Sequence, residues 1–231
     1  MGAAHLAPAN TLEAFDAALA AGVDMIEFDV LSERVDGMGP LFLAHDYEAL
    51  RASARVPLEL ALQHLSGPEF GDVEFDVDLK LPGYGLRVIS ALMDAGLLHR
   101  TLLSTTFHEE LRTIRAQSPG VRLGWSVPRV RRDYTKHALT FLPAVALLQV
   151  ARRALPRRAA AAIGTGRVDA IMAHWRLVTP ALLRAVRGSC GQLYVWTVDE
   201  PSIIEKLLSM SVDGIITNDP RLFRASQPTV A

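Results

Sequence analysis

Carboxylates recur at alternate positions in two short apolar segments of the sequence. The first segment, "MIEFDV" at 25–30, carries Glu27 and Asp29. In the second, "VEFDVDLK" at 73–80, the same spacing applies to Glu74, Asp76, Asp78 and Lys80. Because side chains alternate between the two faces of a strand, each set is expected to share one face. Burying unpaired carboxylates costs several kcal/mol each, so a compensating positive charge is expected nearby.

A hard divalent cation is one candidate for that compensation. Mg²⁺ and Ca²⁺ take carboxylate oxygens as ligands and keep coordination positions for water and phosphate. Asp29 and Asp78 fall near the carboxyl ends of their expected strands, where barrel enzymes carry their active sites. The alternative is a pair of solvent-facing edge strands, or salt bridges between these carboxylates, Lys80 and nearby arginines.

A histidine ends the next apolar segment, "LFLAHD" at 41–46. The stretch before it, which contains "DGMGP", is too short for a crossover helix, so 41–46 is predicted to pair with 24–30 as an antiparallel hairpin. This pairing would carry His45 to the mouth that holds the carboxylates. An imidazole there can act as a general acid or base near neutral pH. The alternative reading of His45 is an ordinary surface or core residue.

Short apolar runs alternate with helical patterns along most of the chain, which indicates a parallel sheet wrapped by helices. Strands are expected at 24–30, 41–46, 73–79, 101–106, 121–127, 169–175, 192–198 and 213–218. Without the hairpin strand this leaves seven, one short of a (β/α)₈ TIM barrel. The chain opens on a helix with Asn10 as its expected N-cap and Gly22 at its end. We expect the missing first strand upstream of Met1, and one domain over 1–231.

Composition limits the partners. The 24 Lys and Arg residues nearly cancel the 25 Asp and Glu residues, which argues against a nucleic-acid binder. One cysteine excludes an internal disulfide, and the absence of a visible secretory signal leads us to expect a cytoplasmic protein. The apolar segment 137–163 is interrupted by Arg152 and Arg153, too early to span a bilayer. It is expected to form an amphipathic helix packed on the domain, with contact to a membrane surface as the alternative.

Taken together, these segments resemble the glycerophosphodiester phosphodiesterases. The family's motifs appear in order along nearly the whole chain: "LAPANTLEAF", "IEFDV", "LAHD", "DLK", "STTF", "YVWTVDE" and "VDGIITNDP". Each is weak alone, but seven in order with matching spacing are specific. The resemblance implies a TIM-barrel enzyme that uses a divalent metal, Mg²⁺ or Ca²⁺. It would hydrolyse small-molecule glycerophosphodiesters to sn-glycerol 3-phosphate and an alcohol.

The resemblance also implies roles for individual residues. Glu27 and Asp29 match the first two metal ligands of the family. Asp78 takes the place of a ligand that is usually Glu, one methylene longer. Lys80 matches a barrel lysine that balances charge near the phosphate. His45 matches the second catalytic histidine, expected to protonate the leaving alcohol.

The match to the family is open to a second interpretation at Trp196 and departs from the family at the start of the sequence. Trp196 matches a residue that lines the pocket for the glycerol or alcohol part, although a core Trp on a barrel strand would look the same. The family's opening His-Arg-Gly aligns with Met1 at its arginine, so the first catalytic histidine is absent from this sequence. His5 was weighed as a substitute, but it lies four residues beyond the expected site. Ala9 also replaces a usual Glu.

These departures put the activity of the chain as given in question. Either the natural chain carries the strand and its histidine upstream, or the barrel has an open seam and the protein is a degraded relative. The alternative functions are a non-catalytic barrel that binds a phospholipid headgroup or a metal, and a lipid phosphodiesterase of the sphingomyelinase D type. The apolar stretch 138–150 would favour a lipid substrate.

Overall fold

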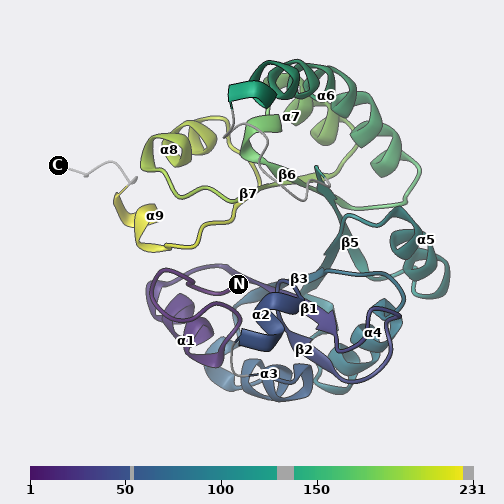
Figure 1. Cartoon of the computed structure of the whole chain (residues 1–231), viewed down its shortest axis with the longest axis vertical. Helices are drawn as coiled ribbons and strands as arrows, with labels where there is room; N and C mark the ends of the chain where they lie inside the picture. Colours follow the sequence, from purple (N-terminus) through teal and green to yellow (C-terminus); the bar gives the residue numbers. More distant parts are fainter. Residues whose placement is uncertain (53–54, 129–137, 226–231) are drawn as a thin grey trace.

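One curved sheet organises the computed structural model, which describes residues 1–52, 55–128 and 138–225. Its strand order is β2-β1-β3-β4-β5-β6-β7-β8, and helices lie around its outer face (Figure 1). The strands are β1 (Met25–Ser32), β2 (Leu41–Leu43), β3 (Glu74–Leu79), β4 (Thr101–Thr105), β5 (Arg122–Val127), β6 (Ala170–His174), β7 (Gln192–Trp196) and β8 (Gly214–Ile215). This arrangement agrees with the expected barrel that lacks one strand.

The predicted hairpin is present. β2 pairs antiparallel with the end of β1, with Val30 opposite Leu43, while every other neighbouring pair in the sheet is parallel. Several predicted strands extend one or two residues beyond the observed ones, and two were longer by three residues or more. The strand expected at 41–46 ends at Leu43, and the strand expected at 213–218 is reduced to Gly214–Ile215. Both shortened strands lie at the ends of the sheet order, where one side has no neighbouring strand to continue the ladder.

Helices connect the parallel strands and pack outside them (Figure 1). They are α1 (Leu12–Ala21), α2 (Tyr47–Ala52), α3 (Leu58–Leu65), α4 (Gly85–Asp94), α5 (His108–Gln117), α6 (Ala138–Gly164), α7 (Pro180–Gly188), α8 (Pro201–Ser209) and α9 (Arg221–Ala225), with short 3₁₀ turns at Pro68–Phe70, Leu98–Arg100 and Trp175–Leu177. The expected helix at 137–163 corresponds to α6. Within the described residues, no helix is both long and apolar enough to cross a membrane.

The N-cap of α1 differs from the prediction. Thr11, not Asn10, caps the helix: its Oγ1 accepts a hydrogen bond from Ala14 N at 3.2 Å. Asn10 adopts a left-handed backbone with φ of 59°, which turns its side chain away from the helix. Asparagine tolerates this conformation better than most residues. Gly22 ends the helix in the left-handed conformation, as expected.

The described residues form three buried apolar clusters, of which the two with the most buried residues lie on the two faces of the sheet. The larger lies between the sheet and the outer helices, where Phe28 contacts Phe15 and Phe75 with ring centroids 5.3 and 6.5 Å apart. The smaller fills part of the barrel lumen and contains Leu102, Ala170, Met172 and Tyr194. Apolar side chains therefore line the lumen on β6 and β7, and Leu102 adds one on β4, beside the acidic strand β3.

The barrel is open between β1 and β8. No strand in the described part of the chain joins them, and a cavity of about 960 Å³ lies between them. Residues 1–3 reach into this seam, where Gly2 N donates to Glu27 O at 2.8 Å and the Met1 amino group contacts the Glu27 carboxylate. His5 N donates to Asn218 O at 2.9 Å on the β8 side. This short segment therefore bridges one end of the seam.

A buried carboxylate on α5 fixes the start of α4, directly after the acidic strand β3. Glu110 is 5% exposed, and its carboxylate accepts hydrogen bonds from Gly83 N at 2.8 Å and Gly85 N at 2.7 Å. A Cβ at position 85 would lie 2.6 Å from Glu110 Oε1, so only glycine permits this approach. The contact holds the loop that follows Lys80.

We predict that Glu110→Ala lowers the free energy of unfolding by about 2 kcal/mol or more, because it leaves two backbone N–H groups near the interior without an acceptor. Chemical denaturation followed by circular dichroism measures the change. Glu109→Ala, at the exposed neighbouring position of α5, is the matched control and should change stability by less than about 0.5 kcal/mol. Equal effects of the two substitutions would refute the capping role.

Candidate active site

The parallel register of β1 and β3 brings three predicted ligands together. Asp29 lies opposite Asp78 in this register, and Glu27 is two residues earlier on the same face of β1. Glu27, Asp29 and Asp78 each offer a carboxylate oxygen, and these oxygens lie within 4.8 Å of one another. The three residues, named here the acidic cluster, lie at the carboxyl-end mouth of the barrel. Asp29 is the most buried of them, at 1% exposed.

Lys80 neutralises part of the acidic cluster. Its Nζ lies 2.5 Å from Asp29 Oδ1 and 2.6 Å from Asp78 Oδ2. The salt bridges that the sequence left open as an alternative to a metal are therefore present. The Met1 amino group pairs with Glu27, so three carboxylates face two ammonium groups and the cluster keeps one excess negative charge when all three acids are ionised.

The pKa values of the cluster reflect this competition between burial and charge. Burial opposes ionisation of Asp29, but Lys80 and the other nearby cations outweigh it and lower the pKa of Asp29 to about 2. Burial raises the pKa of Glu27 and of Asp78. The Met1 amino group and then Lys80 act in the opposite direction at Glu27, and Lys80 does so at Asp78. For Lys80, burial is outweighed by the surrounding carboxylates, which raise its pKa well above the ordinary value. An additional cation would favour the ionised form of all three acids.

Asn10 orients Asp29, a role that the sequence analysis missed. Its Nδ2 donates to Asp29 Oδ2 at 2.9 Å, and its Oδ1 accepts from Asp29 N at 3.1 Å. Asn10 is itself 6% exposed. The available signal was the asparagine of "PANT", which was assigned to helix capping. One amide thus holds the backbone and the side chain of Asp29 together.

His45 lies just beyond the end of β2, beside the acidic cluster. Its Nδ1 is 3.1 Å from Asp46 Oδ2, and 58% of its side chain is exposed. The charge of His45 contributes to lowering the pKa of Asp29 and of Asp78, which reflects its proximity to both. Asp46 also accepts a hydrogen bond from Ala49 N at 2.8 Å, which anchors it to the start of α2. The His45 ring is therefore accessible to solvent, and its Nδ1 is held by Asp46.

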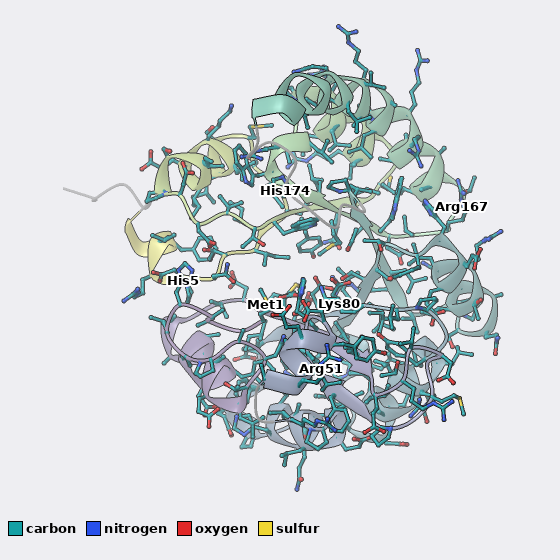
Figure 2. The ribbon with its side chains drawn as sticks, viewed as in Figure 1. Met1, His5, Arg51, Lys80, Arg167 and His174 are labelled. Atoms are coloured by element: carbon teal, nitrogen blue, oxygen red, sulfur yellow. The ribbon has the colours of Figure 1, made fainter. Side chains whose placement is uncertain are left out.

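Trp196 and His174 form the opposite wall of the mouth. Trp196 is half-buried at the end of β7, and its Nε1 donates to Met172 O at 2.9 Å. The ring of His174, at the end of β6, stands nearly perpendicular to that of Trp196 with centroids 5.2 Å apart. Figure 2 shows His174 across the centre of the view from Met1 and Lys80. His174 was missed in the sequence, although it follows Ala170 and Met172 at the lumen-facing spacing of two.

The other carboxylates of β3 lie deeper in the lumen. Asp76 is 1% exposed with no hydrogen bond to its Oδ1, and burial raises its pKa well above the ordinary value. Glu74 pairs with Arg122 at 3.0 Å. His5, weighed as a substitute for the missing histidine, is exposed and lies at the edge of the molecule, away from Lys80 (Figure 2). The structure therefore does not bring His5 to the mouth.

The donor set of the acidic cluster fits a divalent metal ion. All three residues present carboxylate oxygens, which are the ligands that Mg²⁺ and Ca²⁺ prefer. The buried Asp29 Oδ1 lies 2.5 Å from the Lys80 ammonium, so a bound cation would share this carboxylate with Lys80. Chemically, the site combines three carboxylates, a lysine and a histidine at one mouth.

Comparison with known proteins identifies the family. The model of the glycerophosphoryl diester phosphodiesterase family matches residues 1–56 and 85–222, most of the chain. The chain belongs to the glycerophosphoryl diester phosphodiesterase family. A relative in Caldanaerobacter subterraneus subsp. tengcongensis, named glycerophosphodiester phosphodiesterase, is 24% identical over 92% of this chain and 89% of its own.

Solved structures of the same family share the fold. A glycerophosphodiester phosphodiesterase from Agrobacterium tumefaciens superposes with a TM-score of 0.69 at 20% identity, over 97% of this chain and 96% of that one. A phosphodiesterase from Oleispira antarctica was solved in complex with the product sn-glycerol-3-phosphate. It superposes with a TM-score of 0.67 at 17% identity, over 97% of this chain and 93% of that one. The family match does not include residues 57–84, which contain Asp78 and Lys80. The positions of these two residues at the site are therefore known from the structure of this chain.

We predict that Asn10→Gly weakens the affinity of this family member for a divalent cation by about 10- to 100-fold, because Asp29 loses the partner that orients it. Glycine accepts the positive φ of position 10, so the backbone need not change. Isothermal titration with Mg²⁺ and with Ca²⁺ measures the affinity. Gln63→Ala, which removes an exposed amide from α3, is the control. An unchanged affinity in Asn10→Gly would exclude the orienting role.

Proposed function

We propose that this protein hydrolyses glycerophosphodiesters to sn-glycerol 3-phosphate and an alcohol, in a reaction that depends on Mg²⁺ or Ca²⁺. The observation that carries the proposal is the convergence of Glu27, Asp29 and Asp78 beside Lys80 at the mouth of the barrel. Membership of the phosphodiesterase family supports the same reaction. The relatives' names and the product bound to the Oleispira antarctica enzyme support the substrate class.

In this proposal Glu27, Asp29 and Asp78 are the residues that hold the cation. A bound divalent ion would supply Lewis acidity that stabilises the growing negative charge on the phosphate oxygens. Lys80 lies beside the same position and would bind a phosphate oxygen through its ammonium. Its ion pairs with Asp29 and Asp78 fix its position before substrate arrives, so little reorganisation is needed.

His45 is the proposed general acid. Asp46 holds its Nδ1, which leaves Nε2 for the substrate, where it would donate a proton to the oxygen of the leaving alcohol. The exposure of the His45 ring suits a group that meets a substrate entering from solvent. Trp196 would cover the glycerol or alcohol part from the opposite wall, where its ring packs against the lumen cluster.

The base that activates the attacking group has no family counterpart in this sequence, where Met1 aligns with the arginine of His-Arg-Gly. Loss of one acid–base partner typically lowers the rate by about 10² to 10⁴. The proposal is therefore a metal-dependent hydrolase with His45 as its acid and with no base assigned. A protein that binds the metal or the headgroup without turnover is the competing outcome of the assay below.

We predict that the chain releases glycerol 3-phosphate from glycerophosphocholine with added Mg²⁺ or Ca²⁺, and that chelation abolishes the release. His45→Ala should lower kcat by a factor of about 10² or more, because the leaving oxygen loses its proton donor.

The control is His64→Ala, which removes a histidine of α3, outside the mouth. The Nε2 of His64 lies 2.7 Å from the Oδ1 of Asp16 on α1. Release that persists under chelation, or a His45→Ala variant as fast as the His64→Ala control, would contradict the proposed roles. No release in any metal would favour the binding protein over the enzyme.

A further inference from the structure

A second cavity lies on the outer face of the barrel, between α5 and α6 and away from the mouth. Its volume is about 130 Å³, and it is lined by His108, Leu111, Arg112, Trp125, Ala162, Arg167 and Val168. Figure 2 shows Arg167 at the outer margin of the molecule, distant from Lys80 and His174. The residues of the proposed reaction do not reach this cavity, here named the outer pocket.

Cationic groups converge on the outer pocket. Arg112 and Arg167 line it, and the guanidinium of Arg158 lies over the Trp125 ring with Cζ 5.3 Å from the centroid. The His108 ring packs against Trp125 with centroids 4.6 Å apart. Burial lowers the pKa of His108, and the charges of Arg158, Arg167 and Arg112 lower it further, so all three guanidiniums act on this imidazole.

Carboxylates do not balance these charges within the described residues. None there forms an ion pair with Arg112, Arg158 or Arg167, whereas the neighbouring Arg115 pairs with Asp169 at 2.6 Å. The recorded side-chain contact of Arg167 is a hydrogen bond from its Nε to Thr165 Oγ1 at 3.0 Å. Three guanidiniums beside one cavity repel each other unless an anion compensates them. The arrangement therefore favours a negatively charged ligand.

The floor of the outer pocket is apolar. Leu111, Trp125, Ala162 and Val168 are all buried, and together they exclude water from one side of the cavity. Ion pairs strengthen where the local dielectric constant is low, so an anion on this floor would interact with the arginines more strongly than in open solvent. The planar guanidinium matches the oxygens of a phosphate group in geometry.

We propose that the outer pocket binds a phosphate group, either as inorganic phosphate or as a small phosphate monoester whose carbon body rests on the apolar floor. The cavity accommodates a tetrahedral anion with a few additional atoms. Arg112, Arg158 and Arg167 supply the donors, and His108 gains a proton partner when the anion is bound. This binding site is separate from the acidic cluster and does not depend on the proposed hydrolysis.

The test is calorimetric titration of inorganic phosphate, glycerol 3-phosphate and glycerol into the full chain with a chelator present, so that no metal at the mouth contributes. Both phosphates should bind in a saturable manner and glycerol should not. Tighter binding of the monoester would assign the floor to its carbon body, and equal binding would assign the site to phosphate alone. Arg158→Gln should weaken binding by about tenfold or more, because one charged donor is lost.

The matched control is Arg157→Gln at the adjacent, exposed position of α6, which removes the same charge but not the contact with Trp125, and should change affinity by less than about twofold. Arg167→Gln, at a residue that lines the pocket, is the second test variant and is used if Arg158→Gln lowers the melting temperature by loss of its contact with Trp125. In NMR titrations, phosphate should raise the pKa of His108. No saturable binding to the parent, or equal affinity in the Arg157, Arg158 and Arg167 variants, would overturn the proposal.

Discussion

The ammonium of Lys80 between Asp29 and Asp78 is the contact on which the candidate site depends. Both carboxylates lie on neighbouring parallel strands that face the lumen, and each would be costly to bury without a partner. Removing one member of a buried ion pair typically costs about 3–5 kcal/mol, so the lysine and the acids require each other. With Glu27 and its ion pair to the Met1 amino group included, three carboxylates face two ammonium groups, so the ionised cluster keeps one excess negative charge.

The fold provides this arrangement through register. Because β1 and β3 run parallel with Asp29 opposite Asp78, side chains of the same phase meet at the carboxyl end of the sheet. Deeper in the lumen, Arg122 spans from β5 to Glu74 and compensates the lower acidic layer. The lumen side of β6 and β7 carries the apolar residues Ala170, Met172 and Tyr194, so the acidic groups of β1 and β3 face Trp196 across the mouth. The open seam beside β1 leaves Glu27 next to residues 1–3.

Periodic features of the site could be predicted from the sequence, and contacts between distant segments could not. The alternation of Glu27, Asp29 and Asp78 with apolar residues indicated lumen-facing strands, and the short connection before β2 indicated a hairpin. Asn10 was assigned to a cap, because nothing local distinguishes an asparagine that caps a helix from one that reaches Asp29. Glu110 looked like an ordinary helix residue, since its partners Gly83 and Gly85 precede it by 25 residues or more. The predicted hairpin placed His45 at the mouth, and the family resemblance pointed to Trp196. His174 could have been found by extending the alternation of Ala170 and Met172 to the end of β6.

Calorimetric titration of Mg²⁺ and Ca²⁺ into the parent chain and an Asp29→Asn variant tests the central claim most directly, because it measures the cation without requiring turnover. The account predicts one saturable site in the parent and an affinity about 100-fold lower or more in the variant, since Asp29 is the most buried of the three ligands. The folded state of the variant is checked by circular dichroism. Equal affinity in the two proteins, or no binding to the parent, would contradict the assignment of the acidic cluster as a metal site.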